Sequence, residues 1–174
     1  FLIFFCVFFC VFFSAILERM ATTPDSERDP VAARKAAMDL LARREHSRQE
    51  LLRKLGRRFA MEVLAGALEQ LTRDGLQSDT RFAEAYVRQR SERGYGPLRL
   101  VRELRERGID STLADRAVAG ADCDWARLAS GVAEKKFGAE PPEDRKELAR
   151  RLRFLHYRGF DTGVIEDPWR SGFE

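Results

Sequence analysis

Apolar residues recur at helical spacing, three and four positions apart, along most of the chain. No stretch alternates apolar and polar residues in the manner of a half-buried strand, so the pattern predicts helices. The apolar stripes fall into three groups along the chain. The first stripe of each group predicts a helix, and these stripes are Ala37, Leu40 and Leu41; Phe82, Ala85 and Tyr86; and Trp125, Leu128, Ala129 and Val132. The pattern therefore predicts an all-α fold with a core beneath each stripe.

The three groups are copies of one sequence unit. When the copies are aligned, Leu55, Leu104 and Leu155 coincide, which gives a period of about fifty residues. After each leucine comes a basic residue and then an apolar one, with a glycine between them in the second and third copies: Arg58-Phe59, Arg107-Gly108-Ile109 and Arg158-Gly159-Phe160. One ancestral unit used three times explains this agreement.

Each unit predicts three short helices with recognisable ends. The second helices begin at a capping pair or an N-terminal proline: Ser47 with Glu50, Gly96-Pro97, and Asp144 with Glu147. They end at the Arg-Gly turn, because glycine accepts the left-handed backbone at a helix C-terminus. The third helices of the first two units stop at Gly75 and Gly120.

These signals predict the domain organisation: an apolar extension over 1–19, a disordered leader over 20–30, repeat 1 over 31–76, repeat 2 over 77–121 and repeat 3 over 122–174. The last helix of repeat 3 is expected to be disrupted. Pro168 falls where Ala117 lies in repeat 2, and a proline inside a helix removes a hydrogen bond.

The first 17 residues, FLIFFCVFFCVFFSAIL, contain no charge. They lack the basic start of a signal peptide, and a membrane anchor of this length is marginal for a bilayer. We favour a third interpretation, in which the natural chain starts at Met20 and the preceding segment is not native.

Composition and cysteine usage narrow the class of protein. The 174 residues are 44% hydrophobic and 34% charged, with a net charge of +3, which excludes collagen-like, mucin-like and wholly disordered chains. Beyond the apolar extension, Cys123 is the only cysteine, so the body has no internal disulfide and a cytoplasmic location is expected. Its neighbours Asp122 and Asp124 raise a thiol pKa, which argues against a nucleophile.

Enzyme signatures are absent from the sequence. His46 and His156 lie in different repeats without partners at metal-ligand spacing, and there is no phosphate-binding loop. We therefore expect no enzymatic activity, no metal and no cofactor.

Arginines are the candidate contact residues for a partner, because the guanidinium binds carboxylates and phosphates. Arginines concentrate in the first unit, where Arg53, Arg57 and Arg58 belong to a basic run, and in the second unit, where Arg93 does. The alternative is a solvated face on which Arg99 pairs with Glu103 and Arg102 with Glu106. With Tyr95 of the Gly94–Pro97 turn, the candidates are Arg43, Arg44, Arg48, Arg81, Arg88, Arg90, Tyr95, Arg99, Arg102, Arg105 and Arg107. The aromatic residues Phe82, Tyr86, Trp125 and Phe154 are expected in the core.

Three blocks of the chain form a recognisable set: LLARREHSRQELLRKL (40–55), SDTRFAEAYVRQRSERGYGPLRLVRELRERGID (78–110) and RRLRFLHYRGFD (150–161). They resemble the RecX family, the bacterial proteins that modulate the RecA recombinase, within a similarity that runs from about Val31 to Ile165. The resemblance implies an elongated, curved molecule of tandem three-helix, helix-turn-helix-like repeats. It also implies binding along the RecA filament groove and inhibition of the ATPase, recombinase and coprotease activities.

The favoured function is thus a RecA regulator in DNA recombination, repair and the SOS response. Expected partners are the RecA filament and single- or double-stranded DNA, with no membrane for the body of the chain and a monomeric state. A helix-turn-helix transcription regulator is the alternative, because each unit's short helices and tight turn resemble that motif. A hydrolase or transferase is a third hypothesis, disfavoured because no catalytic groups converge.

Overall fold

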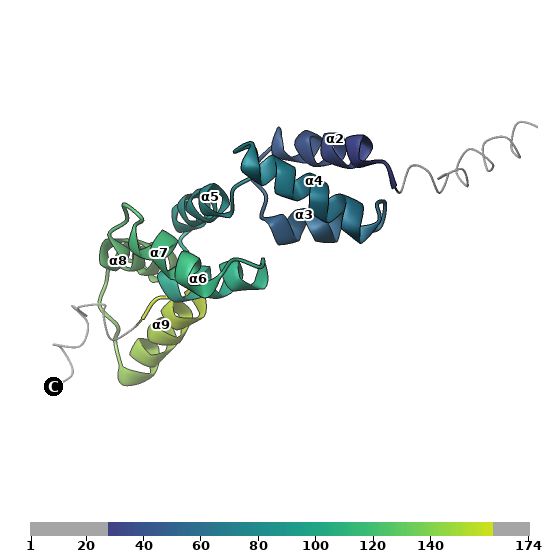
Figure 1. The fold of residues 1–174 in the computed structure, drawn as a ribbon. Helices are drawn as coiled ribbons and strands as arrows, with labels where there is room; N and C mark the ends of the chain where they lie inside the picture. The colour runs from purple at the N-terminus through teal and green to yellow at the C-terminus, as the bar shows by residue number, and fades with distance from the viewer. Residues whose placement is uncertain (1–27, 162–174) are drawn as a thin grey trace, which may run out of the picture. The chain divides into compact units, whose positions relative to one another are not determined.

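In the computed structural model, residues 28–161 are described, and every regular element longer than a single turn among them is an α-helix (Figure 1). The helices are α2 (Pro30–Leu41), α3 (Arg48–Leu55), α4 (Met61–Arg73), α5 (Asp79–Glu92), α6 (Pro97–Glu106), α7 (Ser111–Ala119), α8 (Trp125–Phe137) and α9 (Arg145–Arg158). The predicted all-α class is confirmed. The apolar extension, most of the leader and the Pro168 region lie outside the described residues.

The second helix of each unit begins where its capping signals predict. The Ser47 hydroxyl accepts a hydrogen bond from the Glu50 amide at 3.0 Å, and the Asp144 carboxylate accepts one from Glu147 at 2.6 Å. Pro97 occupies the first turn of α6. The pair at Ser47 differs from the predicted capping pair in one respect: the Glu50 carboxylate forms an ion pair with the Arg44 guanidinium, 3.1 Å away.

The ends of α6 and α9 confirm the predicted role of glycine. Gly108 and Gly159 have φ angles of +79° and +91°, which side-chain-bearing residues rarely adopt. The first unit has no glycine directly before Phe59 and closes its turn without a left-handed residue; the Phe59 amide reaches back to the Leu55 carbonyl at 3.1 Å.

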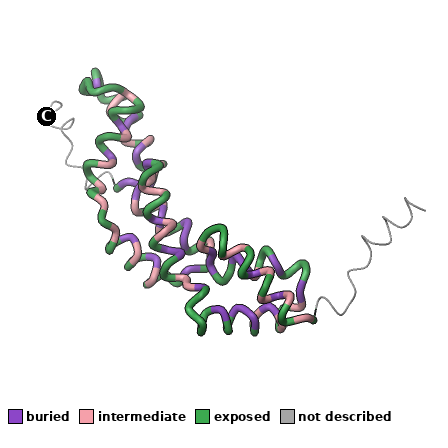
Figure 2. Tube along the Cα trace, turned by 90° about the horizontal axis from the view of Figure 1, so that it is seen from above, coloured by how far each residue is buried: buried purple, intermediate pink, exposed green. Residues whose placement is uncertain are grey.

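The structure contains two compact units, and the first runs to Arg43 and continues with Leu51–Leu76. Its core is formed by residues of α2, α3, α4 and the turn between α3 and α4 that are less than a tenth exposed: Ala33, Ala37, Leu51, Leu55, Phe59, Leu64, Ala67, Leu68 and Leu71. Figure 2 colours the buried positions along the chain. Arg34 and Asp74 form an ion pair at 2.9 Å beside it.

The second unit comprises Arg44–Glu50 and the chain from Gln77 onward. Its first hydrophobic cluster lies among α5, α6 and α7, and its second between α8 and α9. Trp125 packs against both clusters. Phe82 is buried, while Tyr86 and Phe154 are partly buried against these clusters, so the four aromatic residues predicted in the core do pack there. The predicted repeat boundaries stay a prediction.

Candidate functional site

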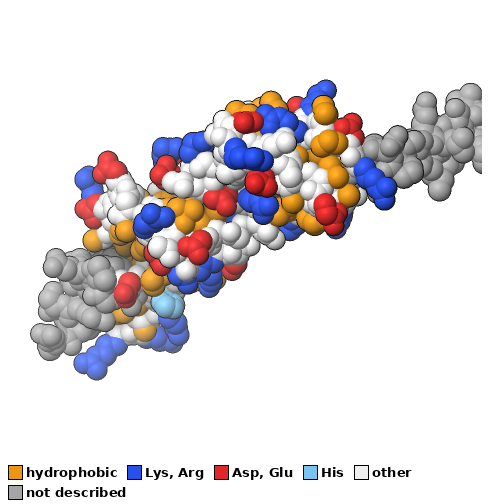
Figure 3. Space-filling model, in the orientation of Figure 1, with side chains coloured by type: hydrophobic (Ala, Val, Ile, Leu, Met, Phe, Trp, Pro, Cys, Tyr) orange, Lys and Arg blue, Asp and Glu red, His pale blue; other side chains and the backbone are white. Residues whose placement is uncertain are grey.

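Most of the arginines predicted to contact a partner are exposed: Arg43, Arg44, Arg48, Arg81, Arg88, Arg102 and Arg105. Several form ion pairs: Arg102–Glu106 at 3.8 Å and Arg105–Asp115 at 3.3 Å are exposed on both sides, Arg81–Glu45 at 2.8 Å is partly exposed, and Arg44 pairs at 3.1 Å with the buried Glu50. On the face drawn in Figure 3, basic and acidic side chains are interspersed. Pairs exposed on both sides contribute little to stability, so Arg102 and Arg105 are available to a partner at small cost.

The remaining candidates are only partly exposed: Arg90, Tyr95, Arg99 and Arg107. Arg90, Arg99 and Tyr95 belong to a network centred on the Glu103 carboxylate. The Glu103 side chain is 10% exposed. It accepts hydrogen bonds from Arg90 at 2.6 Å, Arg99 at 2.8 Å and the Tyr86 hydroxyl at 2.5 Å. The i, i+4 pairing of Arg99 with Glu103 that the sequence left open is therefore present.

The Tyr95 ring completes this network. The guanidinium carbons of Arg90, Arg99 and Arg158 lie 4.0, 4.5 and 5.1 Å from its centroid. Stacking of this kind is favourable because the ring face is electron-rich. The guanidinium groups of Arg90 and Arg99 are thus held by a carboxylate and an aromatic ring inside the protein.

Burial by itself raises the pKa of Glu103, but hydrogen bonds from Arg90, Tyr86 and Arg99 outweigh burial and lower this pKa to about 2. For Tyr86, burial and the hydrogen bond to Glu103 raise the pKa to about 12. The carboxylate stays ionised and the phenol stays protonated at neutral pH.

The lowered pKa of Glu103 makes stability depend on pH. Because the folded pKa lies below the ordinary value of 4.5, the contribution of Glu103 is complete above pH 4.5 and is lost as the pH falls toward 2. We expect a loss of about 3 kcal/mol over this window from Glu103. Urea unfolding at pH 6 and pH 2.5 measures it, and a Glu103→Gln variant should lack this part of the pH dependence. If the free energy of unfolding fell equally between pH 6 and pH 2.5 in the two proteins, Glu103 would not be the source of this pH dependence.

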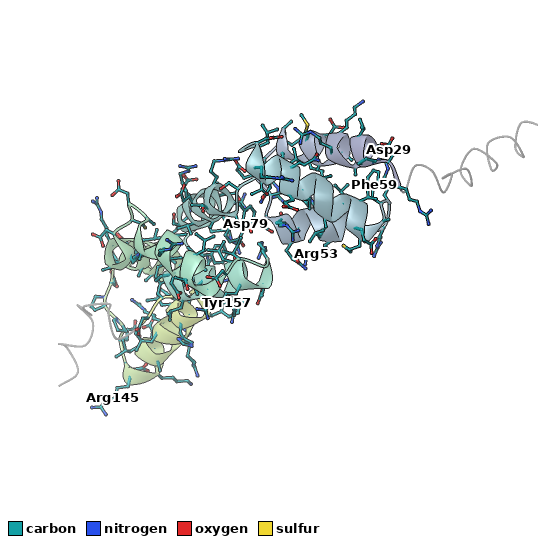
Figure 4. The ribbon with its side chains drawn as sticks, in the orientation of Figure 1. Asp29, Arg53, Phe59, Asp79, Arg145 and Tyr157 are labelled. Carbon is teal, nitrogen blue, oxygen red and sulfur yellow. The ribbon has the colours of Figure 1, made fainter. Side chains whose placement is uncertain are left out.

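The turn at the end of α9 docks on the first turn of α6 (Figure 4, where Tyr157 is labelled). The Gly96 amide donates to the Arg158 carbonyl at 2.9 Å, and the Leu98 amide donates to the Gly159 carbonyl at 3.0 Å. The contact is so close that a Cβ on Gly159 would overlap the backbone of Arg99.

The turn at the end of α6 also docks on another segment, Arg44–Glu50 of the second unit, through contacts of its own. The Ser47 hydroxyl donates to the Arg107 carbonyl at 2.7 Å, and a Cβ on Gly108 would overlap Gln49. Arg107 also lies 3.6 Å from Glu50. The repeated Arg-Gly turn is therefore a docking element that the fold uses twice.

A hollow of about 920 Å³ opens between the end of α5 and the start of α8, beside Cys123 and Arg158. Burial, and then the charges of Asp124 and Asp122, raise the pKa of the Cys123 thiol. The direction predicted from the two aspartates is confirmed. A thiol with a raised pKa is a poor nucleophile.

Metal-binding clusters and membrane-spanning helices are both absent from residues 28–161. No group of three or more His, Cys, Asp or Glu side chains there is placed to hold a metal ion. In the same stretch, no helix combines the length and apolar character required to span a bilayer.

Three residues at the junction of α9 with α6 were not among the sequence candidates: Leu98, Tyr157 and Arg158. Arg158 could have been found, because it aligns with Arg107 in the repeat. Leu98 and Tyr157 carry no such signal, since their exposure depends on how α6 and α9 meet.

Comparison with protein families finds three matching models of RecX, namely its first three-helix domain at residues 33–71, its second at 78–118 and its third at 123–167. A regulatory protein RecX from Pseudomonas entomophila is 45% identical over 137 residues, covering 78% of this chain and 88% of that protein. One from Halorhodospira halophila is 47% identical over 135 residues, covering 77% and 84%.

Solved structures of similar fold include two of RecX. A crystal structure of regulatory protein RecX has a TM-score of 0.69 at 24% identity, covering 79% of this chain and 71% of that one. The structure of RecX from Lactobacillus salivarius has a TM-score of 0.67 at 22% identity, covering 79% and 92%.

Proposed function

This chain belongs to the RecX family of regulatory proteins, and on that premise we propose that it binds the RecA filament and inhibits its ATPase, recombinase and coprotease activities. The observation that carries the proposal is the family relationship: family models match all three three-helix domains, and a curated relative is 45% identical over 137 residues. DNA within the filament is a further partner in this proposal, and the protein acts in the cytoplasm without catalysis of its own.

The exposed arginines support the proposal physically. Arg102 and Arg105 have side chains 68% and 51% exposed on α6, and their ion pairs are long. Release of such arginines from their surface carboxylates costs little, so they can bind acidic groups of a filament. Arg90 and Arg99 are poor candidates by comparison, because Glu103 already holds them.

The test is the ATPase rate of RecA on single-stranded DNA as the protein is added. We expect inhibition that weakens as salt rises, since exposed charges are screened. An unchanged ATPase rate at stoichiometric amounts would refute the proposal. Sequence-specific duplex binding without any effect on RecA would favour the transcription-regulator alternative.

Replacing Arg102 and Arg105 together by glutamine is expected to weaken inhibition about threefold to thirtyfold, which corresponds to the loss of up to two exposed charge contacts. Helicity should not change. Arg73→Gln is the matched control, because the Arg73 side chain is also 68% exposed and pairs loosely with Glu69 at 3.9 Å on α4. Equal inhibition by the double variant and the control would place the contact surface elsewhere.

A further inference from the structure

Two large apolar side chains are exposed where the α9 turn docks on α6. Leu98 is 52% exposed and Tyr157 is 72% exposed. The Leu98 amide bonds to the carbonyl of Gly159, two residues after Tyr157, and the Arg99 guanidinium lies 5.4 Å from the Tyr157 ring. The two side chains therefore stand at one junction, and neither belongs to a hydrophobic cluster of the second unit.

The earlier docked turn shows that the fold does not require apolar residues at these positions. In the repeat alignment, Gln49 takes the place of Leu98 and Glu106 takes the place of Tyr157. The Arg-Gly turn docks there too, with Gly108 close to the Gln49 side chain where Gly159 is close to the backbone and Cβ of Arg99. Since polar side chains occupy the corresponding positions of the first junction, docking of such a turn does not by itself require Leu98 and Tyr157 in the second.

Basic side chains extend from this apolar pair along both helices. Arg102 and Arg105 follow Leu98 at i+4 and i+7 on α6, and Arg153 and Arg150 precede Tyr157 at i−4 and i−7 on α9. Residues at these spacings share a helix face. All four arginines are exposed. Within the described residues Arg153 has no ion pair, while Arg102, Arg105 and Arg150 have exposed guanidinium groups 3.8, 3.3 and 3.2 Å from a carboxylate.

We propose that Leu98 and Tyr157, with the flanking arginines, form a docking surface for an acidic protein segment that carries one large apolar side chain. The inference rests on the proposed function and locates its contact with the filament. Tyrosine and arginine are enriched among the few residues that dominate the binding energy of protein interfaces, which have a more apolar centre and a polar rim. The positive charge of the rim selects a partner rich in carboxylates.

The test replaces Leu98 and Tyr157 in the full chain by glutamine, the residue type that the first junction tolerates. Val31→Gln with Met61→Gln is the matched control, because these side chains are 75% and 54% exposed in the first unit. We expect the concentration of the Leu98→Gln, Tyr157→Gln variant that half-inhibits the RecA ATPase to be at least tenfold higher than that of the parent. The control variant should inhibit as well as the parent, and the melting temperatures of both variants should stay close to that of the parent.

A second measurement does not depend on RecA. An acetylated Asp-Glu-Leu-Glu-Asp peptide is added to the isotope-labelled protein, and the amide resonances of Leu98, Arg99 and Tyr157 are followed. We expect shifts in the parent that are absent from the double variant and from a charge-reversed Lys-Arg-Leu-Arg-Lys peptide. Such shifts would support the surface even if the parent had no effect on RecA, in which case only the proposed function fails.

Several results would overturn the inference. The first is full inhibition by the double variant, and the second is the absence of peptide shifts at the three amides. A double variant that loses single-stranded DNA binding but keeps filament inhibition would assign the surface to nucleic acid. A parent dimer that the double variant converts to a monomer would assign it to a second copy of the chain.

Discussion

Replacing Glu103 by alanine is expected to lower the free energy of unfolding of the second unit by about 3 to 5 kcal/mol, the usual cost of removing one partner of a buried ion pair. Arg90 and Arg99, with side chains 17% and 19% exposed, would lose their carboxylate while staying largely out of water. The Tyr86 hydroxyl would lose its acceptor as well. Urea unfolding followed by circular dichroism measures the change.

The matched control for Glu103 is Glu106, one turn further along the same helix. Its side chain is 62% exposed and its pair with Arg102 is 3.8 Å long, so Glu106→Ala should change stability by less than about 0.5 kcal/mol. The two substitutions are alike in helix propensity. A similar loss from both would mean that the Glu103 network contributes no more than a surface ion pair.

Much of the fold could be predicted because its signals are local. The apolar stripes at helical spacing mark the helices, and Pro97 and Asp144 mark where two of them begin. Gly108 and Gly159 mark the ends of α6 and α9 through a backbone conformation that other residues avoid. Because these signals repeat along the chain, the three-helix unit could be predicted from the sequence alone.

The division of the arginines into buried and exposed ones was less predictable. Arg99 and Glu103 are four residues apart on one helix, so their pairing could be considered from spacing alone. Arg90 and Glu103 lie on different helices, and their contact depends on the angle at which α5 meets α6. Tertiary packing decides which guanidinium groups face the solvent, and the local sequence pattern does not report that packing.

Gly159→Ala is expected to destabilise the second unit by about 2 to 5 kcal/mol, for two separate reasons. A side chain is strained at a φ of +91°, and the new Cβ would overlap the backbone and Cβ of Arg99. The overlap would push the α9 turn off α6 and weaken the bonds from the Gly96 and Leu98 amides. Urea unfolding gives the total loss, and amide exchange at Gly96 and Leu98 shows whether the docked turn opens.

Two other glycines separate these causes. Gly75 has a φ of +70°, but a Cβ added there would meet nothing within 4 Å, so Gly75→Ala should cost only the backbone strain, about 1 to 2 kcal/mol. Gly131 lies inside α8 with the same open space, and Gly131→Ala should stabilise by about 0.5 to 1 kcal/mol because alanine favours helix. If Gly159→Ala costs no more than Gly75→Ala, close approach to Arg99 is not what holds the α9 turn against α6.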